Sequence, residues 1–180
     1  NQLKHVGGKN GYGAKLTNIF STEFIVETSD GKNVYKQVFN NNMSIKNDPV
    51  ITKKKLKQFT KITYTPDFKK FKIKGLTNDM LNIMKKRAYD MTACTNKANI
   101  YFNDEKIKCN CFEKYINYYI GNNDESIRAF ESINERWQIG VCVSNNECFE
   151  QITFVNGINT IKGGKHVDYI LNQITKKLIE

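Results

Sequence analysis

The chain has 180 residues, of which 39% are hydrophobic and 12% aromatic, so it can bury one packed core or two small ones and is too apolar for a disordered tail. Its 28 basic and 18 acidic residues give a net charge of +10, which favours polyanionic partners. No uncharged apolar run approaches the roughly 18 residues that span a bilayer, so we expect no membrane segment. The chain begins with Asn1 rather than Met, which suggests a piece of a longer protein.

The first 75 residues predict one helix and three strands. Apolar residues at helical spacing follow a glycine-rich stretch, and Asp30-Gly31 separates two alternating segments, which is a strong hairpin signal. In chain order we expect a helix over 14–20, strands over 23–28 and 33–39, a long, mobile, Asn- and Lys-rich loop over 40–57, and a third strand over 59–65.

The remaining residues, 76–180, predict three helices and four strands. A long helix begins at Thr77 and has one apolar face, formed by Leu81, Met84, Ala88 and Met91. We then expect a hairpin of strands 98–102 and 106–111, a Tyr-rich helix over 112–120, and strands 136–144 and 151–156 across a polar turn at 145–146. A closing helix from about Gly164 should bury Val167, Ile170, Leu171, Ile174 and Leu178. The chain is therefore predicted to form two α+β pieces, 1–75 and 76–180.

The five cysteines, an odd number without a CxxC pair, do not have the spacing of a zinc site. Cys109 and Cys111 would share one face of a strand, and we expect them to be small buried hydrophobic residues. Free thiols of this kind indicate a reducing compartment, either the cytosol or the nucleus.

The stretch VGGKNGYGAKL, residues 6–16, holds four glycines directly before a predicted helix. Glycine lets backbone N–H groups approach an anion closely, and a helix N-terminus attracts negative charge, so phosphate is the expected ligand. A plain turn is equally consistent with the glycines alone. The Walker A pattern fails because Ala14 follows Gly13 where Lys is required, and the dinucleotide pattern fails because Leu16 stands at the third glycine.

Four segments carry a resemblance to a known family. They read GGKNGYGAKLTNIFSTEF, KKRAYDMTA, INERWQIGVCVS and QITFVNGINTIKGGKHVDYI, in that order along the chain. The first closely resembles the nucleotide-binding loop of eukaryotic-type DNA topoisomerase II, a member of the GHKL ATPase superfamily, and the others resemble the helix that leaves the ATPase lobe and parts of the transducer domain. The resemblance implies an α+β fold, with residues 1–75 as the C-terminal part of a GHKL (Bergerat) ATPase sandwich and residues 76–180 as the connecting helix and the first part of a transducer.

The resemblance also implies an ATP-binding role for the loop. The positions that it assigns are Gly8, Lys9, Asn10, Gly11, Tyr12, Gly13, Ala14 and Lys15. Lys9 stands where most relatives carry arginine, and the 40–57 segment departs most from the family. Tyr12 contacts the nucleotide or packs under the loop, and the sequence leaves both open.

A second glycine pair precedes the last helix, in Lys162-Gly163-Gly164-Lys165-His166. We interpret it as an ordinary helix entry rather than a second phosphate site. His166 has no neighbour that would make a nucleophile and base pair.

Other parts of the family's machinery are expected outside this chain. The family's Mg²⁺-binding asparagine and water-activating glutamate precede the loop, so the resemblance assigns no catalytic residue and no metal ligand here, with ATP and Mg²⁺ as cofactors of the parent enzyme. The implied partners are double-stranded DNA and a second protomer, with no membrane, and the implied location is the nucleus. The parent would relax and decatenate DNA by ATP-driven passage of one duplex through a break in another, and this fragment alone is expected to be inactive.

Two other classes of protein stay open on the sequence. A GHKL ATPase of the chaperone or mismatch-repair type would share the glycine loop but not the later segments. A non-enzymatic basic nucleic-acid-binding module would explain the clusters of basic residues over 53–57, 69–74 and 85–87. Any one such run is, however, more often a solvated face.

Overall fold

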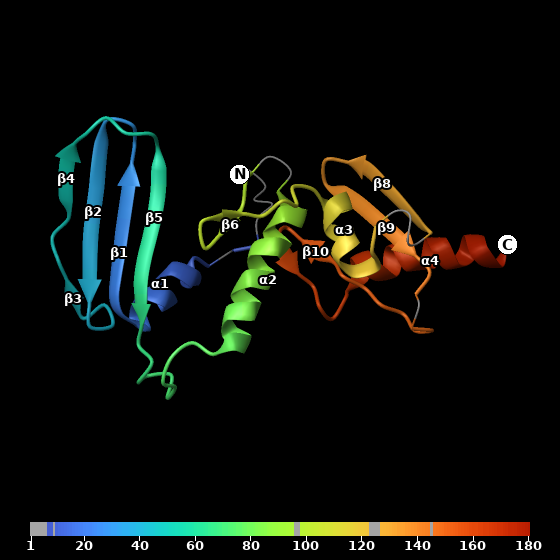
Figure 1. Cartoon of the computed structure of the whole chain (residues 1–180), viewed down its shortest axis with the longest axis horizontal. Coiled ribbons are helices and arrows are strands. Elements are labelled where there is room, and N and C mark those ends of the chain that lie inside the picture. Colours follow the sequence, from blue (N-terminus) through green and yellow to red (C-terminus); the bar gives the residue numbers. More distant parts are fainter. Residues whose placement is uncertain (1–6, 9, 96–97, 123–126, 145) are drawn as a thin grey trace. The chain divides into compact units, whose positions relative to one another are not determined.

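The computed structural model describes residues 7–8, 10–95, 98–122, 127–144 and 146–180 (Figure 1). The chain separates into two compact units, one formed by Gly8–Thr77 and the other mainly by Asn78–Glu180. Mixed helices and strands occur in both, so the predicted α+β class is confirmed.

The first unit is an antiparallel sheet preceded by one helix, α1 (Tyr12–Ile19). The strands are β1 (Ser21–Ser29), β2 (Asn33–Asn40), β3 (Ile45–Lys46), β4 (Val50–Lys53) and β5 (Phe59–Pro66). Their order is β3-β2-β1-β5, and β4 pairs with β2 (Figure 1). Helix α1 lies at the end of the sheet where β1 begins, opposite the β1–β2 turn (Figure 1). The helix and the three strands that were predicted for this unit are confirmed as α1, β1, β2 and β5.

The β1–β2 turn is held by Asp30. Its Oδ1 atom accepts hydrogen bonds from the backbone N–H groups of Lys32 (2.8 Å) and Asn33 (2.6 Å), and Gly31 takes the left-handed conformation with φ 97°. Hydrogen bonds from the backbone of Asn33 and Lys32 hold the pKa of Asp30 below its usual value. The Asp-Gly pair thus sets the register that joins Phe24 to Phe39, and buried Phe24 forms the centre of this unit's core.

The predicted loop over 40–57 is wrong, because this segment returns twice to the edge of the sheet. Asn41, Asn42 and Met43 turn the chain with φ between 50° and 67°, after which β3 and β4 both pair antiparallel with β2. The β-branched residues Ile45 and Val50–Thr52 favour this extended conformation. The surrounding asparagines and lysines dominate the composition and hide the two short strands.

The second unit contains three helices and three antiparallel hairpins among its described residues. The helices are α2 (Asn78–Cys94), α3 (Phe112–Ile120) and α4 (Lys165–Ile179). The hairpins pair β6 (Tyr101–Phe102) with β7 (Glu105–Lys106), β8 (Arg128–Asn134) with β9 (Trp137–Cys142), and β10 (Phe154–Val155) with β11 (Ile158–Asn159). Ala93, Ile107, Cys109 and Tyr115 form the buried core. The three predicted helices are confirmed, as is the hairpin at Asn103-Asp104, where both residues have positive φ.

The two strands predicted over 136–144 and 151–156 are shorter in the structure, at Trp137–Cys142 and Phe154–Val155, and they do not pair with each other. Strand β9 instead pairs with β8, which the sequence reading missed, and β10 pairs with β11. Strand β8 is mostly exposed and polar and so gave no clear alternation. Its turn did carry a signal, because Asn134 Oδ1 accepts from the N–H groups of Arg136 (2.9 Å) and Trp137 (3.1 Å). The expected turn residue Asn145 lies outside the described residues.

The apolar faces of α2 and α4 are only partly buried, since Ala88 of α2 and Val167, Ile170 and Ile174 of α4 are half-buried. On α2, Leu81, Met84 and Met91 keep 40 to 44% of their surface, whereas Asp90, Thr92 and Ala93 are buried. Helix α4 buries no residue fully, and its Leu178 is 82% exposed. Helical periodicity locates an apolar face but does not show what covers it.

The predicted strand around Cys109 and Cys111 is also wrong. Cys109 is buried in the core, as expected, but Cys111 is only half-buried and occupies the position before α3. All five cysteines are free thiols.

Candidate functional site

The glycine-rich stretch forms the entry to helix α1. Gly11 is the residue before the helix and has φ 67° and ψ 20°, a left-handed conformation that glycine adopts without the Cβ clash of other residues. Tyr12, Gly13, Ala14 and Lys15 make the first turn. Backbone N–H groups in a first turn have no partner inside the helix and remain available to an anion. Lys9 lies outside the described residues.

This entry is open to solvent. A Cβ added at Gly8, Gly11 or Gly13 would meet no atom within 4 Å, and Tyr12 is 62% exposed. The first turn carries no acidic side chain, so nothing in it opposes a negative ligand. The structure thus places Gly8 and residues 10–15 around one exposed helix N-terminus. The Tyr12 side chain is exposed there as well.

The opposite end of α1 is fixed to the sheet by residues that the sequence reading missed. Asn42 Nδ2 donates to the carbonyl oxygen of Ile19 (3.0 Å) and to Asp67 Oδ2 (3.1 Å), and Ser21 Oγ donates to the carbonyl of Thr17 (2.6 Å). The hydrogen bond from Asn42 is the main reason that the pKa of Asp67 lies below its usual value. These contacts hold the helix, and with it the glycine-rich entry, at the end of the sheet.

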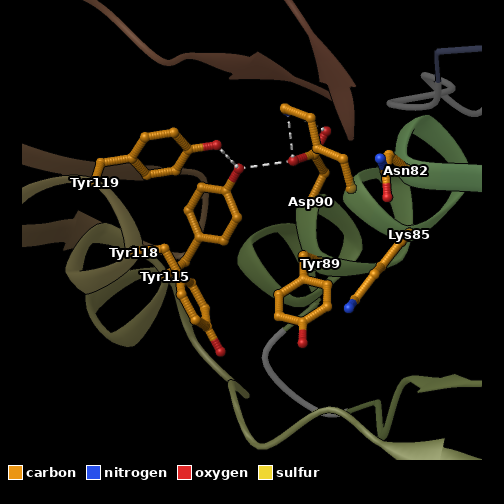
Figure 2. A pocket seen from close by; sticks show the side chains of 8 residues that line it. Asn82, Lys85, Tyr89, Asp90, Tyr115, Tyr118 and Tyr119 are labelled. Atoms are coloured by element: carbon orange, nitrogen blue, oxygen red, sulfur yellow. Dashed lines mark hydrogen bonds and ion pairs between the residues drawn. The ribbon is translucent and has the colours of Figure 1, made fainter. Parts of the chain in front are cut away.

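A second polar cluster joins α2 to α3 around the buried carboxylate of Asp90. Tyr115 donates its hydroxyl to Asp90 Oδ1 (2.7 Å), Lys86 Nζ donates to both carboxylate oxygens (2.9 and 3.0 Å), and Arg87 Nη1 lies 3.5 Å away. Figure 2 shows the Tyr115 hydroxyl between Asp90 and Tyr119, to which it is bonded at 2.8 Å. The segment KKRAYDMTA contributed to the family resemblance, but no role was predicted for its Asp90. The four-residue spacing of Lys86 and Asp90 is a signal for an ion pair on a helix.

Burial and hydrogen bonding act in opposite directions on this cluster. Burial is the largest influence on Asp90 and raises its pKa, but the hydrogen bonds from Tyr115, Lys86 and Asn159, together with the positive charge of Lys86, outweigh it and hold the pKa below the usual value. Burial, reinforced by hydrogen bonds with Tyr119 and Asp90, raises the pKa of Tyr115 far above the ordinary range. The cluster therefore contains an ionised Asp90 carboxylate and a neutral Tyr115 hydroxyl at neutral pH.

The second glycine pair does not form an open entry like the first. His166 Nε2 lies 3.1 Å from Thr160 Oγ1, and Gln151 Nε2 donates to the carbonyl of Ile161 at 2.8 Å. Gly163 and Gly164 both have positive φ. These bonds tie the start of α4 to the neighbouring hairpin, which is the geometry of a structural helix entry.

The residues that the structure describes show neither a metal-binding cluster nor a membrane-spanning helix. Those residues contain no group of three or more His, Cys, Asp or Glu side chains able to hold a metal ion. Among the helices so described, none combines the length and the apolar character needed to cross a bilayer.

Comparison with known proteins gives relatives over nearly the whole chain. The family described as DNA gyrase B matches residues 111–180. DNA topoisomerase 2 of Arabidopsis thaliana is 46% identical, covering 99% of this chain and 13% of the relative, and that of Saccharomyces cerevisiae is 42% identical, covering 99% and 14%.

Solved structures agree. The ATPase region of Saccharomyces cerevisiae topoisomerase II bound to ICRF-187 superposes with a TM-score of 0.87 and 44% identity, over 97% of this chain and 47% of that one. The ATPase and transducer domains of DNA topoisomerase II from Balamuthia mandrillaris superpose with a TM-score of 0.87 and 40% sequence identity, over 96% of this chain and 45% of that one.

The similarity in sequence and fold therefore shows that the chain is homologous to the ATPase region of type II topoisomerases. Within that class, the chain belongs to the eukaryotic DNA topoisomerase 2 family and is homologous to its ATPase region. It spans 13 to 14% of the length of these two relatives and just under half of the two matched ATPase-region structures.

Proposed function

We propose that, within a type II DNA topoisomerase, the chain supplies one wall of an ATP site and the first part of the transducer, which moves in response to the bound nucleotide. The observation that carries this proposal is the exposed, glycine-lined N-terminus of α1 in a chain homologous to a topoisomerase ATPase region. ATP, when bound, supplies the free energy for the conformational cycle. The parent enzyme then relaxes and decatenates DNA by passing one duplex through a transient break in another.

The residues proposed to bind ATP are Gly8, Lys9, Asn10, Gly11, Tyr12, Gly13, Ala14 and Lys15. The glycines leave room for backbone N–H groups to approach phosphate oxygens, since no atom lies where their side chains would be. Asn10 offers amide donors, and Lys15 offers an ammonium group in the first turn of the helix. Tyr12 is exposed and so is available to the nucleotide.

In the family that the loop at residues 6–16 resembles, the Mg²⁺-binding asparagine and the water-activating glutamate both precede that loop. We therefore place the ligand for Mg²⁺ and the catalytic base outside this chain. In the same proposal, the partners are double-stranded DNA and a second protomer, and the location is the nucleus. The net charge of +10 supports a DNA partner, since lysine-rich surfaces attract the phosphate backbone.

The proposal is tested in the full-length enzyme by ATP-dependent relaxation of supercoiled DNA. Lys15→Ala should abolish or strongly reduce relaxation, because the substitution removes a charge-assisted contact with phosphate. Lys32→Ala removes the same charge from the β1–β2 turn, at the other end of the sheet (Figure 1), and should leave relaxation unchanged. Equal activity of both variants would contradict the assignment.

The isolated chain should not hydrolyse ATP, since it lacks the proposed base. Turnover by the isolated chain that disappears in Lys15→Ala would show that this expectation is wrong.

A further inference from the structure

A cavity of about 380 Å³ lies between α2 and α3, in the unit that does not contain the glycine-rich entry (Figure 2). The cavity is largely open to solvent rather than enclosed, so a ligand in it would stay partly exposed. Asn82, Lys85 and Tyr89 share one face of α2, being spaced three and four residues apart, and α3 contributes Tyr115 and Tyr118. The proposed ATP function uses none of these residues.

The walls of the cavity are aromatic and already ordered. Tyr89 and Tyr118 meet edge to face with ring centroids 5.3 Å apart, and Tyr115 and Tyr118 do so at 6.3 Å. Tyr118 nevertheless keeps 55% of its surface exposed, so these contacts leave much of its ring uncovered. Such rings favour stacking or edge-to-face contact with another flat ring.

The charged side chains around the cavity indicate whether the ring should carry a positive or a negative group. Tyrosines around a carboxylate often hold a cation. Here, however, Asp90 is already bound by Lys86 and Tyr115 and lies 3.5 Å from Arg87. Lys85 has no acidic partner among the described side chains, so the cavity has more positive than negative charge around it. An additional cation would be repelled, whereas an anion would be attracted.

We propose that this cavity binds a small, flat aromatic ring that carries an anionic group, with the ring against Tyr89 and Tyr118 and the anion beside Lys85 and Asn82. Aromatic carboxylates and aromatic phosphates share this chemistry. The tyrosine pair selects for the ring, and Lys85 selects for the charge. Asp90 does not contact the ligand; it keeps Tyr115 and Lys86 in place at the floor.

The test is ligand-observed NMR and calorimetry on the whole chain with three probes that separate ring from charge. Naphthalene-2-carboxylate has both features, naphthalen-2-ylmethylammonium has the ring with the opposite charge, and cyclohexanecarboxylate has the charge without the aromatic ring. The first should bind with a Kd on the order of 1 mM or tighter, and the other two should bind at least about tenfold more weakly, as expected for one lost charged contact or stacking contact. Naphthalen-2-yl phosphate, as a fourth probe, distinguishes a preference for phosphate from one for carboxylate.

Matched variants locate the site. Lys85→Gln should weaken naphthalene-2-carboxylate about tenfold, Lys85→Arg should restore binding, and Tyr118→Leu should weaken it several-fold. Lys114→Gln makes the same change on the exposed surface of α3, outside the cavity, and should have no effect. Preference for the cationic probe, equal binding of cyclohexanecarboxylate, or equal loss in Lys85→Gln and Lys114→Gln would each overturn the proposal. Melting temperatures of the variants confirm that each one is folded.

Discussion

The glycine-rich entry to α1 and the Asp90 cluster between α2 and α3 are built in opposite ways. At the entry, the residues that matter are exposed, and a Cβ at Gly11 or Gly13 would touch nothing. In the cluster, the side chains of Lys86, Arg87 and Tyr115 converge on the carboxylate of Asp90, which is 2% exposed. An open helix entry is suited to a ligand that comes and goes, whereas a satisfied buried cluster fixes the position of two helices. The glycine-rich entry and the Asp90 cluster are therefore expected to differ in their sensitivity to substitution.

The largest expected difference in stability is between two tyrosines of the same helix. Tyr115→Ala should lower the free energy of unfolding by about 3 to 5 kcal/mol, because this side chain is 2% exposed and its removal leaves a cavity in the core. Tyr118→Ala, at a position that is 55% exposed, should cost about 1 kcal/mol or less. Denaturant unfolding measures both, and similar losses would show that α3 does not pack as described.

The next largest loss of stability is expected at the carboxylate of Asp90. Asp90→Asn should cost about 1.5 to 3 kcal/mol, since it replaces charge-assisted hydrogen bonds by neutral ones. Because the folded-state pKa of Asp90 is lowered, its stabilisation is fully present above the unfolded value of about 3.9 and is lost as pH falls through the lower folded pKa. Thermal unfolding between about pH 5 and pH 2 should therefore be less steeply pH-dependent in Asp90→Asn than in the wild type. Parallel curves would contradict the ionised state of Asp90.

The smallest effect separates two glycines of the entry. Gly11→Ala should cost about 1 to 2 kcal/mol, because φ 67° is strained for any residue with a Cβ. Gly8→Ala has neither a positive φ nor a nearby atom and should change stability by less than about 0.5 kcal/mol. Unfolding of the two variants under the same conditions is the measurement, and an equal cost would mean that Gly11 is not held left-handed.

The sequence predicted the elements whose signals are local. Helix α3 has the predicted bounds because Gly121, with φ 76°, ends it, and the β1–β2 turn follows from Asp30-Gly31. The glycine-rich entry was found for the same reason, since its conformation depends on glycine and not on packing.

What the sequence did not predict depends on distant partners. Strands β3 and β4 exist because β2 offers an edge to pair with. Strand β8 was missed for a different reason: it is mostly polar and exposed, although Asn134 at its turn carried a local signal. Leu81 and Met84 have the periodicity of a buried face but remain exposed. The buried residues of α2 include Asp90, whose partner Tyr115 is 25 residues away along the chain. Spacing within a helix could not identify that partner.

The central claim is that the entry to α1 binds ATP phosphates through Lys15. It is tested most directly by titration calorimetry of a non-hydrolysable ATP analogue with magnesium, in a chain extended to the full ATPase region, comparing wild type, Lys15→Ala and Lys32→Ala. One charge-assisted hydrogen bond is worth about 1.5 to 3 kcal/mol, so Lys15→Ala should weaken binding roughly ten- to a hundred-fold while Lys32→Ala binds as the wild type does. Equal affinities in all three would mean that the glycines form only a turn and that the phosphates bind elsewhere.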